Sequence, residues 1–357
     1  MQGLSSKSKP WLVLVGGFLG AGKTTLLIAA AKELERRGFR TAIVLNDQGD
    51  ALVDSDLVTR SKLRFGEVTG GCFCCKLSDL IEVMHELDDH RPDVIFAEPV
   101  GSCTDLSATT IRPLMEDGSR YRIAPLSVLV DPARAALLLA EDADPDLSFL
   151  FRKQVAEADL ICFTKSDLYS ELMAGAIFEG RSTRQLSAKS GQGVVAWLDE
   201  VLSGSLAVGA EQLEIDYDRY AHAEAALVWL NLQAKLRYEE PRSNAVILGP
   251  LLAALDADFT SAGVAMVHLK AIVSSSTAFL KGALCANGEQ PVLEGALDAS
   301  PELEHDLLLN LRSLGTAEEV RGIVEQRVRE AGGMVSDLRI SCFHPAAPKP
   351  ERRISLM

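Results

Sequence analysis

The sequence has a deficit of positive charge and lacks any stretch that reads as an export signal or a membrane span. Lys and Arg number 36 against 50 Asp and Glu, a formal net charge of −14, which argues against a general nucleic-acid or anionic-membrane surface. Residues 1–10 have no apolar core of the signal-peptide kind. The longest apolar stretch, residues 12–31, contains Lys23 and four glycines. We therefore expect a cytoplasmic protein that binds neither nucleic acid nor membrane.

Cysteine is also sparse, with seven residues in a chain of 357. In a chain without export these thiols are expected to be reduced. A disulfide framework is therefore not expected, and a tight cluster of cysteines would instead indicate metal binding or redox chemistry.

The length and the hydrophobic pattern predict two domains, because 357 residues exceed what one hydrophobic core usually organises. Residues 1–205 alternate short apolar runs with helical patterns, the rhythm of a P-loop NTPase-like α/β fold with a doubly wound, mostly parallel sheet. Residues 203–210 are small and contain glycine, which is typical of a linker. From residue 206 to 357 the order predicts a smaller α+β domain with an antiparallel sheet. We find no internal repeat.

The elements are assigned from apolar runs and helical periodicity. In the first domain the predicted strands are 11–15, 41–45, 94–97, 126–130 and 160–163, with a last helix at 194–201. In the second they are strands at 225–236, 264–273, 278–285, 306–314 and 335–342, with helices at 244–255 and 317–331.

The strongest motif lies between the first predicted strand and a helical run. Residues 17–25 have the spacing G-x-x-x-x-G-K-[ST] of a phosphate-binding loop, in which glycines let the backbone approach an anion at a helix N-terminus. Lys23 would contact the terminal phosphates, and the Thr24 hydroxyl would ligate Mg²⁺. The alternative is a glycine-rich turn without a ligand. The nucleotide contacts assigned to this loop are Gly17, Gly20, Ala21, Gly22, Lys23, Thr24 and Thr25.

An acidic residue and a glycine follow another buried strand. Glu98 directly follows the predicted strand at 94–97, and Gly101 comes three residues later. Glu98 would organise Mg²⁺ through a water molecule, and the Gly101 amide would sense a γ-phosphate. An ordinary strand followed by a turn is the alternative.

A second loop predicts a preference for guanine. The predicted strand at 160–163 leads into Thr164, Lys165 and, two residues on, Asp167. A carboxylate at Asp167 would accept hydrogen bonds from guanine N1–H and the 2-amino group, donors that adenine lacks. Thr164 stands where many guanine-binding loops have Asn. A backbone contact to guanine O6 is assigned to Ser187, Ala188 and Lys189.

The most discriminating feature is the run Gly71-Cys72-Phe73-Cys74-Cys75. Its three thiolates would balance the charge of one soft cation and bind it at about 2.3 Å. Three protein ligands leave a tetrahedral metal with an open position, which suits a metal that is passed on. The alternatives are small buried hydrophobes or a redox pair. Cys103 is interpreted as a small packed residue, with a fourth thiolate ligand as the alternative.

Together these motifs resemble the CobW family of P-loop GTPases, which is similar to the nickel-insertion and urease-accessory GTPases. The resemblance rests on residues 17–25, 71–75, 98–101, where the family has E-x-x-G, and 164–167. It covers about residues 11–205, and the second domain is similar at lower specificity. It implies GTP hydrolysis coupled to metal binding at the cysteines. It also implies that Asp47, in a segment resembling the family's N-E-x-G, is a switch-region acid near Mg²⁺ or the transferred metal.

The function expected from the sequence is therefore that of a GTP-hydrolysing metallochaperone. Lys23, Thr24, Glu98 and Asp47 are the expected catalytic residues. Cys72, Cys74 and Cys75 would bind Zn²⁺, or Co²⁺ as second choice, for delivery to a client metalloprotein. The alternatives are a GTPase that assists maturation of a cobalamin or corrinoid protein, and a non-enzymatic thiol or metal-storage module. A homodimer is left open.

Overall fold

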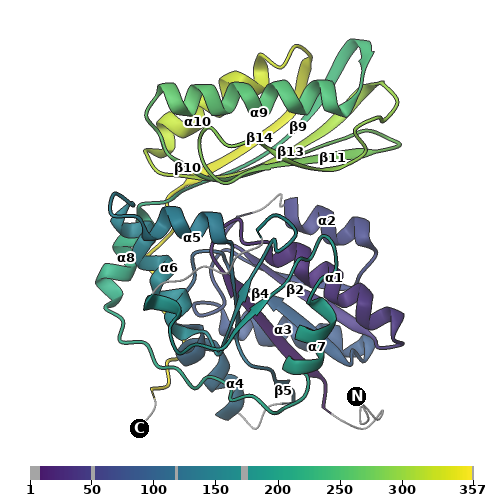
Figure 1. The fold of residues 1–357 in the computed structure, drawn as a ribbon. Coiled ribbons are helices and arrows are strands. Elements are labelled where there is room, and N and C mark those ends of the chain that lie inside the picture. The colour runs from purple at the N-terminus through teal and green to yellow at the C-terminus, as the bar shows by residue number, and fades with distance from the viewer. Residues whose placement is uncertain (1–8, 50–52, 117–119, 170–175, 356–357) are drawn as a thin grey trace. The chain divides into compact units, whose positions relative to one another are not determined.

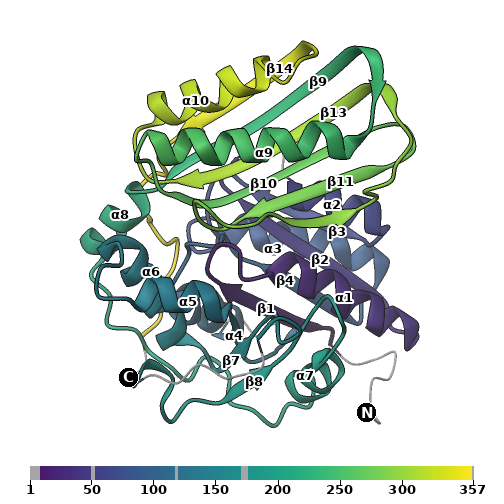
Figure 2. The same ribbon diagram turned by 45° about the horizontal axis from the view of Figure 1, so that its top comes forward.

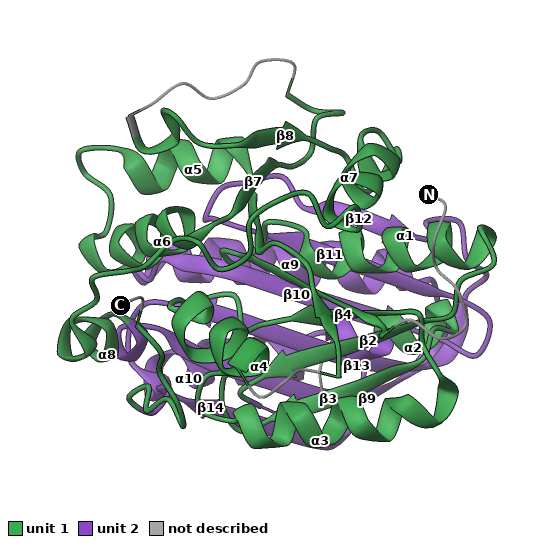
Figure 3. Cartoon of the chain, turned by 90° about the horizontal axis from the view of Figure 1, so that it is seen from below, with its two compact units in different colours: residues 1–48, 57–223, 347–357 green, residues 49–56, 224–346 purple. Residues whose placement is uncertain are grey.

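The computed structural model describes residues 9–49, 53–116, 120–169 and 176–355. The chain divides into two compact units (Figure 3). Unit 1 comprises Met1–Gln48, Leu57–Ala223 and Ala347–Met357, and unit 2 comprises Gly49–Asp56 and Glu224–Ala346. No helix within the described ranges is both long and apolar enough to cross a membrane.

Unit 1 is built on the predicted parallel sheet, with strand order β3-β2-β4-β1-β6-β7-β8 and β5 paired to β1. The strands are β1 (Trp11–Gly17), β2 (Thr41–Asp47), β3 (Phe65–Thr69), β4 (Val94–Glu98), β5 (Arg122–Ile123), β6 (Ser127–Val130), β7 (Leu160–Phe163) and β8 (Thr183–Gln185). Every pairing is parallel. The carboxyl ends of β2, β4 and β1 therefore meet at one edge, where ligands bind in sheets of this kind.

Helices cover both faces of this sheet (Figure 1). The helices up to residue 225, of which α2 and α8 each cross a boundary between the units, are α1 (Lys23–Arg36), α2 (Val53–Ser61), α3 (Leu77–Leu87), α4 (Arg112–Glu116), α5 (Pro132–Leu139), α6 (Pro145–Glu157), α7 (Val194–Val201) and α8 (Tyr217–Ala225). In α1, Leu26, Ala30 and Leu34 recur every four residues and are all fully buried. This spacing places them on one helical face, which packs in the core with β1 residues such as Val13.

Unit 2 is an antiparallel sheet in the order β12-β11-β10-β13-β9-β14. Its elements are β9 (Val228–Arg242), α9 (Asn244–Ser261), β10 (Met266–Ser274), β11 (Phe279–Leu284), β12 (Val292–Gly295), β13 (Glu302–Ser313), α10 (Ala317–Arg329) and β14 (Met334–Phe343). Figure 2 shows α9 and α10 on the same face of the sheet. Apolar residues of both helices and of the strands form a separate core there, as expected for an α+β domain.

The structure corrects the predicted strand at 225–236. Residues Tyr217–Ala225 form α8, and the strand begins only at Val228. The error is confined to residues 225–227, which are apolar and run directly into the strand, so the sequence does not mark where the helix ends. The prediction also missed β3, in which only Val68 is buried, so this edge strand has no apolar run to detect.

Candidate nucleotide and metal site

The loop between β1 and α1 has the backbone that phosphate binding needs. Gly17 has φ 133°, and a Cβ at this position would lie 2.6 Å from the Leu129 carbonyl oxygen. Gly22 is the N-cap of α1 with φ 91°, and no side chain caps the helix. A residue with a side chain would be strained at either position. The first turn of α1 therefore presents N–H groups that an anion can accept from.

Lys23, Thr24 and Glu98 lie together at the carboxyl ends of β1 and β4. Lys23 Nζ donates to the Gly17 carbonyl oxygen at 2.8 Å and lies 4.0 Å from Glu98 Oε1. Thr24 Oγ1 donates to the same carboxylate oxygen at 3.2 Å. All three side chains are buried. The hydroxyl and carboxylate oxygens are the hard donors that Mg²⁺ takes from proteins, so this pair fits the ion.

Gly101 lies directly against the phosphate loop. A Cβ here would be 2.6 Å from Leu19 Cδ2 and 3.1 Å from Lys23 Nζ. A side chain at position 101 would therefore clash with Leu19 and crowd the Lys23 ammonium group, and only glycine lets the backbone come this close. Its place fits the predicted contact with a terminal phosphate.

The two segments predicted to contact guanine are also adjacent. Ser166 N donates to the Leu186 carbonyl oxygen at 3.3 Å, directly before Ser187. Lys165, in the left-handed region at φ 56°, forms an ion pair with Asp131, a residue that the sequence analysis did not single out. Thr164 and Ser187 are buried, Ala188 is half-buried, and Asp167 and Lys189 are exposed.

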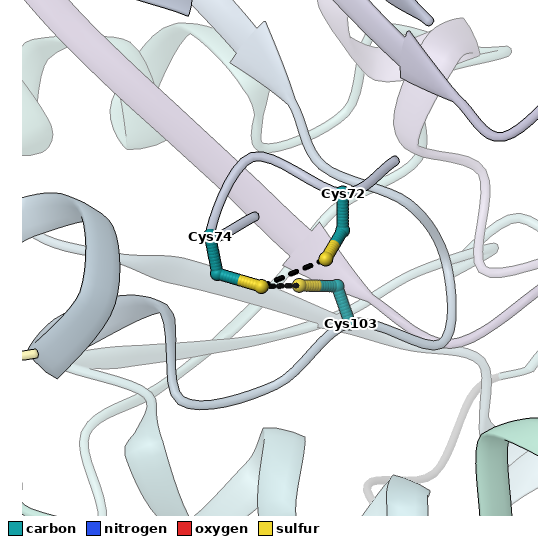
Figure 4. A group of neighbouring side chains, drawn as sticks. All are labelled: Cys72, Cys74 and Cys103. Carbon is teal, nitrogen blue, oxygen red and sulfur yellow. Dashed lines mark hydrogen bonds between the residues drawn. The ribbon is translucent and has the colours of Figure 1, made fainter. Parts of the chain in front are cut away.

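Four cysteine sulfurs gather in the loop after β3 and the segment after β4. Cys72, Cys74 and Cys103 are buried, and their Sγ atoms lie within 4.8 Å of one another. Figure 4 shows these sulfurs turned toward each other. The Sγ distances are 2.7 Å for Cys72–Cys74, 3.9 Å for Cys74–Cys103, 3.4 Å for Cys72–Cys75 and 3.6 Å for Cys74–Cys75. Cys75 is only half-buried.

Asn46 holds the cysteine loop in place, a role that the sequence analysis missed. Its Nδ2 donates to the carbonyl oxygens of Val68 at 2.9 Å and Gly71 at 2.7 Å, and its Oδ1 accepts from Phe73 N at 2.9 Å. The side chain lies at the end of β2 and is buried. Asp47 follows it and pairs in register with Thr69, at the base of the same loop.

The surroundings of Cys74 and Cys75 favour the protonated thiols when no metal is bound. Hydrogen bonds from Cys103, Cys72 and Cys75, together with burial, raise the pKa of Cys74 well above its ordinary value. The hydrogen bond with Cys72 and partial burial raise the pKa of Cys75 to about 11. A thiol in a reactive pair needs the opposite shift, because the thiolate is the attacking species. A divalent cation could ionise this cluster by replacing the protons.

The segment after β14 returns to the cysteine loop. Lys349 N donates to Cys75 Sγ at 3.1 Å, and Glu351 N donates to the Cys74 carbonyl oxygen at 3.0 Å. The Glu351 carboxylate accepts from Ser78 N at 2.9 Å and Ser78 Oγ at 2.7 Å, in the first turn of α3. The partners in these contacts are more than 270 residues apart in the sequence, so no local sequence pattern predicts them.

Comparison with known proteins gives one family-model match, described as "CobW/HypB/UreG, nucleotide-binding domain", over residues 11–189. The zinc chaperone YjiA of Escherichia coli (strain K12) is 30% identical over 167 residues, 45% of this chain and 50% of that protein. The zinc chaperone CobW of Sinorhizobium sp is 28% identical over 229 residues, 56% of this chain and 63% of that protein. The matches thus span about half to two thirds of these relatives' lengths.

Similar solved structures include a Zn(II)-bound YjiA GTPase from E. coli, at 16% identity and a TM-score of 0.34, covering 89% of this chain and 99% of that one. HypB from Helicobacter pylori in complex with nickel has 16% identity and a TM-score of 0.40, covering 55% of this chain and 86% of that one. Likeness at this level adds nothing to the functional argument.

Proposed function

The chain belongs to the CobW/HypB/UreG family of nucleotide-binding domains, and from that premise we propose that it is a GTP-hydrolysing metallochaperone. In this proposal Cys72, Cys74 and Cys75 bind a thiophilic divalent metal, Zn²⁺ before Co²⁺. Hydrolysis of GTP to GDP and phosphate is coupled to delivery of the metal to a client protein in the cytoplasm. The relatives named zinc chaperones support the choice of metal.

The observation that best supports this coupling is that one short segment, residues 98–103, contacts both the phosphate loop and the cysteine cluster. Glu98 accepts the Thr24 hydroxyl hydrogen bond, and Gly101 lies against Lys23. Two residues later, Cys103 Sγ lies 3.9 Å from Cys74 Sγ. A change at the phosphate loop therefore has a path of six residues to the thiols.

The chain's own residues supply the remaining parts of hydrolysis. Lys23 would neutralise charge on the terminal phosphates, and the backbone at Gly101 would bind the γ-phosphate. Thr24 and Glu98 would hold Mg²⁺, which when bound neutralises charge on the β- and γ-phosphate oxygens. Asp47 ends β2, the neighbour of β4, and would act as the switch acid. Asp167, with Ser187, Ala188 and Lys189, would select guanine.

The alternatives differ in what they require of these residues. A storage module needs no phosphate loop with a paired Thr24 and Glu98. A redox pair is disfavoured because the pKa values of Cys74 and Cys75 are raised. A GTPase that serves a cobalamin or corrinoid protein would use the same residues with Co²⁺. Thiolates bind Zn²⁺ more tightly than Co²⁺, so metal supply and client would decide between the two.

The first test is nucleotide hydrolysis. We expect the native protein with Mg²⁺ to bind GTP far better than ATP and to hydrolyse it, and Lys23→Ala to lower the rate at least about a hundredfold. Lys32→Ala is the matched control, because Lys32 is exposed on the same helix. Equal calorimetric affinities for ATP and GTP in the native protein would overturn the guanine assignment. Metal analysis with and without GTP completes the test.

A further inference from the structure

We propose that Cys103 is a fourth ligand of the metal, and that it is the residue through which the bound nucleotide acts on the metal. This inference rests on the proposed function and goes beyond the three-cysteine site. It reverses the sequence-based interpretation of Cys103 as a packing residue. In it, the site has a buried part, Cys72, Cys74 and Cys103, and an accessible thiol at Cys75.

The sulfurs of Cys72, Cys74 and Cys103 form one group, and Cys75 Sγ lies next to two of them. Metal–sulfur bonds of about 2.3 Å in a tetrahedron require sulfurs about 3.8 Å apart. The distance from Cys103 Sγ to Cys74 Sγ is 3.9 Å, and Cys75 Sγ lies 3.4 and 3.6 Å from its two neighbours. The Cys72–Cys74 distance, 2.7 Å, is the shortest of these, so an entering metal would separate these two sulfurs by about 1 Å. Figure 4 shows the Cys103 sulfur turned toward that of Cys74, at a distance close to the tetrahedral spacing.

The backbone around Cys103 is held by buried side chains from α6 and α8. Gln154 Nε2 donates to the carbonyl oxygens of Gly101 at 2.9 Å and Cys103 at 3.0 Å. The Tyr220 hydroxyl accepts from Thr104 N at 3.1 Å. Gln154 thus ties Gly101 and Cys103 together. If Gly101 moves toward or away from a γ-phosphate, Cys103 moves with it.

The other cysteines are anchored elsewhere. Their loop is held by Asn46, through hydrogen bonds with Val68, Gly71 and Phe73. Cys103 and the cysteine loop therefore sit on two separately supported segments, of which only the first contains Gly101. A nucleotide-dependent shift would lengthen or shorten the Cys103–Cys74 distance and would change the number of thiolates on the metal between three and four.

We assign Cys75 as the first ligand to be exchanged when the metal is transferred. It is half-buried, whereas the other three thiols are buried. Metal transfer between proteins proceeds by exchange of one ligand for another, so a client thiolate or imidazole would replace the Cys75 thiolate first. The released thiolate takes up a proton, and the metal keeps its charge and coordination number.

The test is a titration of the full-length chain with Co²⁺, in the presence of GDP and of a non-hydrolysable GTP analogue. Four proteins are compared: native, Cys103→Ser, Cys75→Ser and Cys285→Ser. Cys285 lies in unit 2 and is the matched control. We expect Cys103→Ser to lose about a quarter of the sulfur-to-cobalt charge-transfer absorption and at least tenfold in affinity. The affinity difference between GTP analogue and GDP should vanish in Cys103→Ser and persist in Cys75→Ser.

X-ray absorption of the native Zn²⁺ protein supplies a readout that needs no variant, because it counts sulfurs at about 2.3 Å. Four sulfurs in one nucleotide state and three in the other would support the proposal. Three in both states, or a Cys103→Ser protein identical to native, would overturn it. A Cys72→Ser, Cys74→Ser double variant separates the two levels. If it too keeps the cobalt spectrum, the metal site itself is refuted. If it loses the spectrum while Cys103→Ser equals native, only the role of Cys103 is refuted.

Discussion

Asn46 illustrates how far residue-level function depends on partners distant in sequence. Its amide satisfies three backbone groups of a loop 22 to 27 residues away, and each would be costly to leave unpaired in the interior. The sequence places Asn46 in a family-like segment, but only the pairing of β2 with β3 brings it to the cysteines. By contrast, Lys23 and Thr24 could be predicted because their motif is contiguous.

The exposed Asp167 carboxylate is the residue to which we assign the preference for guanine. We expect Asp167→Ala to lose about 2 to 4 kcal/mol of GTP affinity, because two hydrogen bonds from the base to a charged acceptor disappear. Affinity for ATP should stay the same. Calorimetry measures both, with Asp199→Ala, in α7, as a control. An unchanged GTP affinity would refute the assigned role of Asp167.

We expect the buried Glu157 carboxyl group to make the stability of the protein depend on pH. Burial raises the pKa of Glu157 to about 8, while Thr104 Oγ1 and Ser107 N hydrogen-bond to its carboxyl group at 3.0 and 3.2 Å. Between the ordinary value near 4.5 and 8 the folded protein holds a proton that the unfolded chain has released. The free energy of unfolding therefore falls as pH rises through this window.

Glu157→Gln tests this dependence, since glutamine is neutral at every pH and its side-chain oxygen can still accept from Ser107 N. The free energy of unfolding, measured with denaturant from pH 5 to 8, should depend less steeply on pH in the variant than in the native protein. The difference should be about one proton, ~1.4 kcal/mol per pH unit. If native and variant have the same slope, Glu157 is ionised in the folded protein.

At the scale of elements, the sequence predicted which segments are strands better than how they are arranged. The bounds of β7 and α7 agree with the prediction, because each is a clear apolar run or an amphipathic pattern. The strand order, with β4 between β1 and β2, could not be read from the chain. That order is what places Glu98 against Thr24 and brings Cys103 to Cys74. Hence the two motifs could be predicted separately, but their junction could not.

The segment after β14 acts on α3 as an external cap. Glu351 accepts two hydrogen bonds from Ser78 near the helix N-terminus, where a negative charge is favourable. We expect Glu351→Ala to lower the free energy of unfolding by about 0.5 to 2 kcal/mol and to speed alkylation of Cys75. Glu351→Gln keeps the hydrogen-bond acceptor but not the charge, so its free energy of unfolding should lie between those of the native protein and Glu351→Ala. If Glu351→Ala leaves both the unfolding curve and the alkylation rate unchanged, this cap is only a surface contact.

At the scale of the whole molecule, the chain leaves unit 1 directly after the proposed switch acid. Asp47 ends β2, whereas Gly49–Asp56 belongs to unit 2. There, the Asp54 carboxylate pairs with Lys270 Nζ at 2.7 Å, and Val53 N donates to Asn310 Oδ1 at 2.8 Å. A division into domains at residues 205 and 206 stays a prediction.

The proposed function depends on the coupling of nucleotide and metal, and thermodynamics requires that this coupling act in both directions. If GTP changes the metal affinity relative to GDP, the metal must change the ratio of GTP to GDP affinities by the same factor. Because Cys103 lies two residues beyond Gly101, we expect a difference of about 1 to 3 kcal/mol.

Competition with a chelator would give the metal affinity in the GTP-analogue, GDP and nucleotide-free states, and calorimetry would give the nucleotide affinities with and without metal. A triple Cys72→Ser, Cys74→Ser, Cys75→Ser variant is the control. It should still bind both nucleotides, because the sheet that carries the phosphate loop does not depend on the thiols. Its ratio of GTP to GDP affinities should no longer respond to metal. Equal metal affinities in all three nucleotide states of the native protein would mean two independent sites. Hydrolysis could then not set the moment of metal release, and delivery driven by GTP would have to be abandoned as the function of this chain.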